Sequence, residues 1–373
     1  MEIFEKYNLK KDPFTLTPSI NSDEIIWAGF PKIKSQIEKR IQRSIIVPSS
    51  DLVLNWGEYG SGKTHAARYF CKQNVLSDLA GKYAIPFAFN LVFPKGKEPI
   101  KEIFTQIIDK ININELRKEI AERMSSDFKD EAIRNSTDNI FIQNIIRILL
   151  GSDKMGTSIE ENLIKMYLFG GLDIKNFDKE DGINRKLSTD SDFIQFLSAL
   201  FNVLTYKKHL HSCIILWFDE LEDISTLTMS NISNVNNFFR TIMDKTPNNL
   251  LIFLNLTQSA MMTLSDIGSY LQEAVKSRIT ETINLPMPTK EEIMLYLKEL
   301  LNSPLYRSAP NSVNVYFPFT EEVIEEIIQD VPNVSLRKYN LIFSNLLGNA
   351  LFDDVSEIDK SYYESKKTDL PIF

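Results

Sequence analysis

The sequence has few cysteines and no long hydrophobic run. Only Cys71 and Cys213 occur among 373 residues, and neither stands in a CxxC or Cys/His pattern, so we expect neither a zinc site nor a disulfide framework. Both lie in apolar stretches, where a buried, inert thiol is usual. No apolar run is long enough to span a bilayer, and the N-terminus lacks the basic region and apolar stretch of a signal peptide. We therefore expect a cytoplasmic protein without a membrane partner.

The sequence also lacks an excess of positive charge. It carries 42 lysines and arginines against 50 acidic residues, which gives a net charge of −8. A protein that binds nucleic acid over its whole surface is normally basic, so the charge balance does not support general DNA binding. It leaves open a local basic patch or a basic channel in an oligomer. The composition is otherwise ordinary for a globular chain, with 43% hydrophobic residues, and its length suggests roughly one to three domains.

Apolar segments of strand length recur along the chain. They predict strands at residues 52–56, 83–93, 213–218 and 250–256, with a weaker one at 283–285. The third and fourth are largely continuous apolar runs, typical of a parallel sheet covered on both faces. Pro86 places the second strand at a sheet edge, because proline cannot donate to a ladder. We therefore expect an α/β fold with a parallel sheet flanked by helices.

The most specific motif follows the first strand directly. It reads Gly57-Glu58-Tyr59-Gly60-Ser61-Gly62-Lys63-Thr64 and continues through His65 as a helix. Glycines let backbone N–H groups approach a triphosphate, and a helix start adds unpaired N–H groups and a positive dipole end. Lys63 is expected to reach the β- and γ-phosphates and Thr64 to bind Mg²⁺. The motif predicts an ATP and Mg²⁺ site; the alternative is a glycine turn with an incidental lysine.

A second motif ends the third strand, where Asp219 and Glu220 follow an apolar run. Ligands of parallel sheets bind at the carboxyl ends of the strands. Asp219 is expected to hold the magnesium ion, and Glu220 to orient and deprotonate the attacking water. The alternative for such a pair is a helix cap. Glu222 and Asp223, which follow, are expected to be solvated surface acids.

With these motifs and three later features, the chain resembles the AAA+ ATPases, and in particular the branch that contains the origin-recognition replication initiators and the ExeA/TniB-like bacterial ATPases. The opening Tyr7-x-Leu9-x-x-Asp12-Pro13-Phe14-x-x-x-Pro18 is similar to the start of ExeA-type chains. A looser likeness, from Phe169-Gly170-Gly171 to Asp219-Glu220-Leu221-Glu222, is to ATPases of phage-defence systems such as BREX. The resemblance covers residues 1–352, except a helical stretch of about 113–190 that we interpret as an insertion.

This resemblance implies roles for three more residues. Thr257, with Asn255 and Gln258 as rivals, matches the polar sensor 1 position near the γ-phosphate; the alternative is a polar strand end. Arg278 matches the arginine finger that enters a neighbouring subunit's site, where a planar, permanently charged donor suits the γ-phosphate. Arg337 matches sensor 2, at the start of the third lid helix. For both arginines the alternative is a surface side chain at a helix end.

The resemblance also divides the chain. We expect a lead-in and adenine-side helix at 1–50, a nucleotide-binding domain at 51–288, a helical lid at 289–352 and a loosely held polar tail at 353–373. The lid begins at a capping box, Thr289 to Glu292. The initiators of this branch carry a winged-helix domain after the lid, and the roughly twenty residues after Leu351 are too few for one.

Three functions compete at this stage. The first is an oligomeric ATP hydrolase, built from copies of this chain, that assembles or remodels a nucleic-acid-associated complex in phage defence or mobile-element function. The second is a signalling switch that binds ATP and recruits an effector protein without nucleic acid. The third is a membrane-associated secretion ATPase like ExeA, which the lack of an apolar span disfavours.

Overall fold

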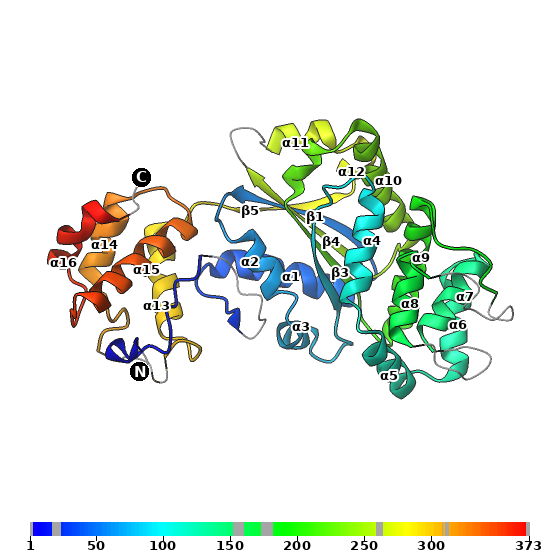
Figure 1. Ribbon diagram of the computed structural model, residues 1–373, viewed down its shortest axis with the longest axis horizontal. Helices are drawn as coiled ribbons and strands as arrows, with labels where there is room; N and C mark the ends of the chain where they lie inside the picture. Colours follow the sequence, from blue (N-terminus) through cyan, green and yellow to red (C-terminus); the bar gives the residue numbers. More distant parts are fainter. Residues whose placement is uncertain are drawn as a thin grey trace.

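The predicted strands form one five-stranded, all-parallel sheet with helices on both faces (Figure 1). The computed structural model describes residues 3–16, 24–151, 160–172, 182–258, 264–307, 309 and 313–370. Its strands are β1 Ser50–Glu58, β2 Phe87–Val92, β3 Ile214–Asp219, β4 Leu250–Gln258 and β5 Ile279–Leu285. Their order in the sheet is β2-β3-β4-β1-β5, which confirms β2 as an edge strand, and Pro86 lies just before it. The α/β prediction is confirmed.

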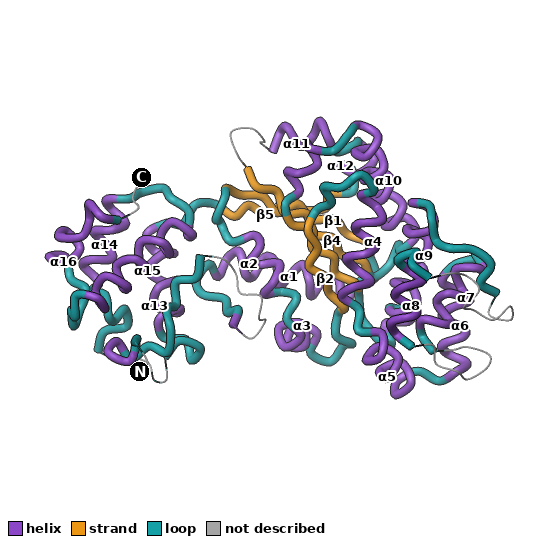
Figure 2. The backbone as a smooth tube through the Cα atoms, in the orientation of Figure 1, coloured by secondary structure: helices purple, strands orange, loops and turns teal. Residues whose placement is uncertain are grey.

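The helices fall into a sheet-associated set and a separate set beyond β5 (Figure 2). Among the described residues they are α1 Pro31–Ile46, α2 Lys63–Tyr69, α3 Gln73–Ala80, α4 Pro99–Lys110, α5 Ile113–Arg123, α6 Ser126–Ser136, α7 Ile140–Leu149, α8 Glu161–Leu168, α9 Asp190–Leu204, α10 Met229–Lys245, α11 Leu264–Tyr270, α12 Glu273–Lys276, α13 Lys290–Leu301, α14 Glu321–Asp330, α15 Leu336–Phe352 and α16 Lys360–Lys366. No helix among the described residues is both long and apolar enough to cross a membrane.

Side chains alternate between the two faces of the sheet, as the two-residue period of a strand requires. Val53, Trp217 and Phe253 pack against α1, α2 and α3, and the Trp217 and Phe253 rings stack with centroids 3.8 Å apart. Leu52, Leu54 and their neighbours on β3 and β4 pack on the other face, in one core shared with α4 to α10. The stretch expected to be an insertion supplies α5 to α8 to this second core, which it extends away from the sheet.

Helices α13 to α16 form a core of their own, which also contains the start of the chain. Tyr7, Leu9 and Phe14 are buried in it, and the Tyr7 hydroxyl donates to the Val355 carbonyl over 2.6 Å. The chain therefore begins on the lid and crosses to the sheet domain before α1; Pro18, part of the opening motif, lies outside the described residues. The capping box at Thr289 is confirmed.

The expectation of a loosely held tail after residue 353 was wrong for residues 353–370. Ile358 and Tyr363 are fully buried in the lid core. Helix α16 lies within this segment, and the Tyr363 hydroxyl donates to Asp330 on α14 over 3.0 Å. The segment is polar in composition, but Ile358 and Tyr363 pack into the core of α13 to α16 and hold it there.

Both cysteines are unpaired, and Cys213 is buried. Cys71 is only partly buried, and desolvation raises the pKa of each thiol to about 12, which disfavours the reactive thiolate at neutral pH.

Candidate nucleotide-binding site

The glycine-rich loop lies between β1 and α2, and its glycines are required by contact and by conformation. A Cβ on Gly57 would lie 2.3 Å from the Leu285 carbonyl oxygen of neighbouring β5. Gly62 caps α2 with a φ of 98°, in the region that favours glycine. The loop can therefore keep its backbone N–H groups free of side-chain cover at a helix start, as a phosphate cradle requires.

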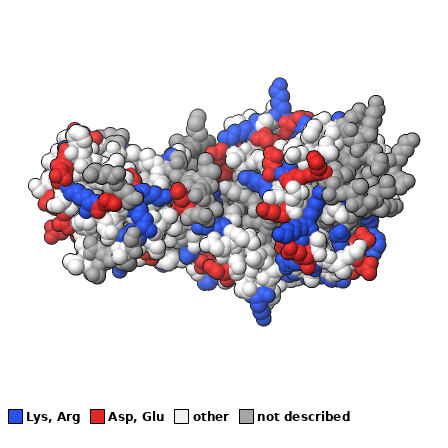
Figure 3. Space-filling model, turned by 60° about the horizontal axis from the view of Figure 1, so that its bottom comes forward, with Lys and Arg blue, Asp and Glu red and all other residues white. Residues whose placement is uncertain are grey.

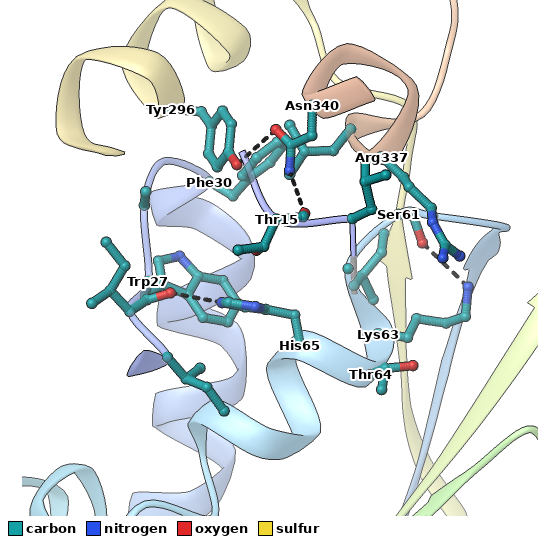
Figure 4. Close-up of a pocket in the computed structure, with 18 of the residues that line it drawn as sticks. Thr15, Trp27, Phe30, Ser61, Lys63, Thr64, His65, Tyr296, Arg337 and Asn340 are labelled. Atoms are coloured by element: carbon teal, nitrogen blue, oxygen red, sulfur yellow. Dashed lines mark hydrogen bonds between the residues drawn. The ribbon is translucent and has the colours of Figure 1, made fainter. Parts of the chain in front are cut away.

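Lys63 lies folded over this loop (Figure 4). Its ammonium group donates to the Gly57 and Glu58 carbonyls, both over 2.8 Å, and to the Ser61 hydroxyl over 3.2 Å. Only 6% of the residue is exposed. Burial lowers the pKa of Lys63 to about 8, although Glu222, Asp219 and Glu58 act in the opposite direction. A phosphate would offer this cation stronger, charge-assisted partners than carbonyls do.

Asp219 ends β3 directly beside the loop. Its Oδ1 accepts from the Asn255 side-chain amide over 3.2 Å, and the same amide lies 3.3 Å from the Lys63 carbonyl. Asn255 is fully buried and also accepts from Asn55 on β1. Asn255, a rival for the sensor position, thus ties β4 to the acid and to the first turn of α2. Thr257 instead lines the cleft, and in the register of the sheet it lies opposite Gly57.

Glu220 follows with a positive φ of 63°, which turns the chain sharply away from β3. Its carboxylate forms an ion pair of 2.8 Å with Lys95, a residue just beyond β2. Lys95 also contacts Asp223 over 2.8 Å, and hydrogen bonds to Asp223 and Glu220 raise the pKa of the lysine. The ion pair therefore orients the Glu220 carboxylate toward Lys95, so a catalytic role for Glu220 would require it to part from that lysine.

Removal of Lys95 is accordingly expected to accelerate ATP turnover. In Lys95→Ala, Glu220 loses its cation, so we expect kcat to rise about threefold or more, consistent with the modest strength of exposed ion pairs. Steady-state phosphate release measures this. Lys97→Ala, in the same loop and also exposed, is the matched control. A kcat that falls or stays unchanged in Lys95→Ala would show that the pair does not restrain the base.

Glu222 was expected to be a solvated surface acid, and this was wrong. It lines the same cleft as Lys63 and Thr257 and is only partly exposed. One carboxylate oxygen accepts from the Thr257 backbone N–H over 2.8 Å. Asp223 is likewise held in its ion pair with Lys95. Spacing alone could not show this, because the short 3-10 helix Leu221–Thr226 brings both acids back toward the sheet.

The base-side wall comes from the segment before α1, which sequence reasoning had described only as an adenine-side region. Figure 4 shows Trp27, Phe30 and His65 along the cleft, with Tyr296 of α13 beside Phe30, at 6.4 Å between ring centroids. His65 is within 2.7 Å of the Ile26 carbonyl, and burial lowers the pKa of this imidazole. A neutral histidine among aromatic rings suits a flat, uncharged base. The apolar run at residues 25–30 was the available signal.

Arg337 lies in the first turn of α15 and reaches the loop from the helices beyond β5 (Figure 4). It donates to the Tyr59 hydroxyl, and its guanidinium lies 5.1 Å from the centroid of that ring. A Cβ on Gly60 would lie 2.8 Å from Arg337 Cβ, so the lid rests directly on the loop. This arginine is therefore in reach of the phosphate end, as the sensor 2 interpretation requires.

Arg278 lies elsewhere. It precedes β5, whose first residue pairs with Leu52 near the start of β1, whereas Leu285 pairs with Gly57. At about 3.3 Å per residue, the length of β5 puts Arg278 roughly 20 Å from the loop of its own chain. Its guanidinium forms a 2.6 Å ion pair with Asp244 on α10. Arg278 is therefore far from the glycine-rich loop of its own chain. The arginine-finger prediction requires it to reach the loop of a second copy of the chain.

The residues at the phosphate end fit a magnesium ion. The Thr64 hydroxyl and the Asp219 carboxylate both line the cleft, and hard oxygen donors are what Mg²⁺ prefers. The described cleft thus brings together the glycine-rich loop, the Lys63 cation, oxygen donors that suit a metal, the Glu220 carboxylate and an arginine from α15.

The parallel sheet, the glycine-rich loop and this cleft are the arrangement typical of P-loop folds, with helices α13 to α16 beside the sheet domain. No protein-family model and no curated protein matches the chain. Solved structures do match. The ORC2 protein of Aeropyrum pernix, in ADPNP–ADP complexes, is 13% identical with a TM-score of 0.53 over 97% of this chain and 73% of that protein.

Two further structures agree. Cdc6p of Pyrobaculum aerophilum is 11% identical with a TM-score of 0.51 over 97% of this chain and 72% of its own. A Walker-type ATPase of Pyrococcus abyssi is 13% identical with a TM-score of 0.50 over 95% of this chain and 76% of its own. At such identities the comparison establishes the fold: it is the AAA+ fold in the form found in ORC and Cdc6 proteins, which confirms the resemblance at that level.

Proposed function

We propose that this protein is a cytoplasmic Mg-ATP hydrolase that works as an oligomer and couples hydrolysis to the assembly or remodelling of a nucleic-acid-associated complex. The observation that carries the proposal is the single cleft shared by the loop, the β3 acids and the lid arginine. A site built from both domains changes when the triphosphate is cleaved, so the lid moves with the nucleotide state. Phage defence or mobile-element function is the setting that the sequence resemblance suggests.

Each residue in the cleft has a distinct task in this proposal. Backbone N–H groups of the loop and Lys63 bind the β- and γ-phosphates. Thr64 and Asp219 hold Mg²⁺, which offsets phosphate charge when bound. Glu220, once released from Lys95, takes a proton from the attacking water. Thr257 and Arg337 contact the γ-phosphate from the sheet and the lid.

Arg278 completes the site of a neighbouring subunit in this proposal. In isolation it is held by Asp244, an ion pair that the subunit contact replaces with the γ-phosphate. A planar cation that stays protonated at any working pH suits the charge that develops there. Assembly and turnover are then linked, because an unassembled chain lacks this arginine at its own loop.

Arg278→Ala is therefore expected to reduce kcat by about 100-fold or more while ATP affinity changes little, since arginine fingers contribute up to about 10³–10⁵ in kcat. Turnover and sedimentation velocity, with and without ATP and duplex DNA, measure this. Arg240→Ala is the matched control, since Arg240 is an exposed arginine on α10 whose side chain donates to Asn237. Normal hydrolysis by Arg278→Ala, with assembly that ignores ATP, would rule out the shared site.

The second candidate is an ATP-dependent switch that recruits an effector protein without nucleic acid. The charge distribution favours it: the net charge is −8, and on the face in Figure 3 acidic and basic side chains are interspersed. The same experiment separates the two. Turnover stimulated by DNA supports the first candidate, and slow turnover that DNA does not affect supports the second.

A further inference from the structure

The inference concerns the tip of β4, beyond the point where its neighbour ends. Pairing between β3 and β4 stops at Phe218 and Leu254, whereas β1 accompanies β4 as far as Gln258. The last four residues of β4 therefore have a strand on one side only. A backbone N–H on the open side must find another acceptor, because an unpaired one is costly.

Glu222 supplies that acceptor. Its Oε2 lies 2.8 Å from the Thr257 nitrogen, where a carbonyl of a longer β3 would otherwise stand. The position is well anchored, since Leu221 and Ile224 of the same 3-10 helix are fully buried. The side chain thus replaces a missing strand with a charge-assisted hydrogen bond.

This hydrogen bond holds a residue at the phosphate end of the cleft. Thr257 lines this cleft and lies opposite Gly57 in the register of the sheet. The position of its backbone therefore determines where its hydroxyl lies relative to the loop. Two residues earlier, the buried Asn255 is tied to Asp219. The tip of β4 is therefore held at two points. Asp219 accepts from Asn255, and Glu222 accepts from the Thr257 backbone.

We propose that Glu222 is a positioning residue for ATP hydrolysis, which sets the Thr257 hydroxyl against the γ-phosphate by accepting the Thr257 backbone N–H. The proposal rests on the proposed ATPase function. It is a hydrogen-bonding role, so a neutral acceptor of the same shape should serve. A role in holding the metal or its waters would instead need the charge.

Four variants test this: Glu222→Gln, Glu222→Ala, Thr257→Val, and the double variant Glu222→Ala with Thr257→Val. We expect Glu222→Gln to keep kcat within about threefold of wild type, and Glu222→Ala to lose about tenfold, the scale of one hydrogen bond to a charged group. The double variant should be within about twofold of Thr257→Val alone, because coupled residues are not additive. Half-saturating Mg²⁺ should stay unchanged in the two single Glu222 variants, because the proposed role does not involve the metal.

Three results would overturn the proposal. Equal losses in Glu222→Gln and Glu222→Ala, with a raised Mg²⁺ requirement, would assign the carboxylate to the metal. Additive losses in the double variant would show that Glu222 does not act through Thr257. Unchanged turnover in Glu222→Ala, with thermal unfolding as in the wild type, would leave the ATPase proposal intact and refute this one. A wild-type chain without turnover would refute both.

Discussion

Replacement of Lys63 by alanine is expected to abolish ATP binding at concentrations that saturate the wild type. The ammonium group is the one lysine cation that lines the described cleft, and only carbonyl and hydroxyl oxygens hold it now. A phosphate therefore gains a charge-assisted contact with a lysine that is itself largely buried. We expect the dissociation constant to rise by about 100-fold or more, which corresponds to about 2.7 kcal/mol.

The loss should not come from unfolding. Burial lowers the pKa of Lys63 to about 8, so the charged form carries a desolvation cost in the free protein, and removal of the side chain relieves it. Melting temperature, measured beside fluorescent-nucleotide titration, checks this. Lys32→Ala, exposed on α1, is the control. In the wild type, affinity should also weaken as the pH rises through about 8, where Lys63 loses its proton. Tight ATP binding by Lys63→Ala would overturn the central assignment.

The local parts of the site could be predicted from sequence because their geometry is set by neighbouring residues. The loop at residues 57–64 needs glycines for its own backbone and stands between a strand and a helix. Asp219 stands at the carboxyl end of an apolar strand, where the sheet itself aims it at the ligand. In both cases a few consecutive residues are enough to predict the position of the functional group in the fold.

The partners of these residues could not be predicted because the fold brings them together from distant segments. Lys95 meets Glu220 only because β2 and β3 are neighbours in the sheet. Glu222 enters the cleft through the positive φ of Glu220, a conformation that a glutamate's identity does not indicate. The docked tail depends on Ile358 and Tyr363, whose apolar signal is too sparse to stand out in a polar segment.

The same contacts show how the lid and the sheet domain communicate. Arg337 and the segment before α1 lie at opposite ends of the cleft, and each joins both parts. The Gly29 N–H donates to Glu299 on α13 over 2.7 Å, while the neighbouring Ile26 carbonyl meets His65 on α2. In the proposed function, a bound nucleotide would touch the base-side segment at one end and Arg337 at the other. Hydrolysis removes a group from the phosphate end alone, so we expect it to affect these two contacts unequally.

Replacement of Glu220 by glutamine is expected to separate ATP binding from hydrolysis. The amide keeps the size of the side chain but cannot accept a proton from water, so kcat should fall by about 10²–10⁴-fold. The phosphate contacts of the loop and Lys63 remain, and we expect the dissociation constant for ATP to stay within about threefold of wild type. Fluorescent-nucleotide titration and single-turnover hydrolysis measure the two quantities on the same sample.

Two matched variants make this result specific. Glu220→Gln also weakens the ion pair with Lys95, and Asp223→Asn weakens the same lysine's other contact while leaving the base in place. If water activation is the task of Glu220, Asp223→Asn keeps or raises turnover and only Glu220→Gln loses it. Glu222→Gln, two residues away in the same cleft, should also remain active. Turnover near the wild-type rate in Glu220→Gln, together with a collapse in Glu222→Gln, would assign the base to Glu222 instead, because its carboxylate also lies in the cleft and acts on Lys63.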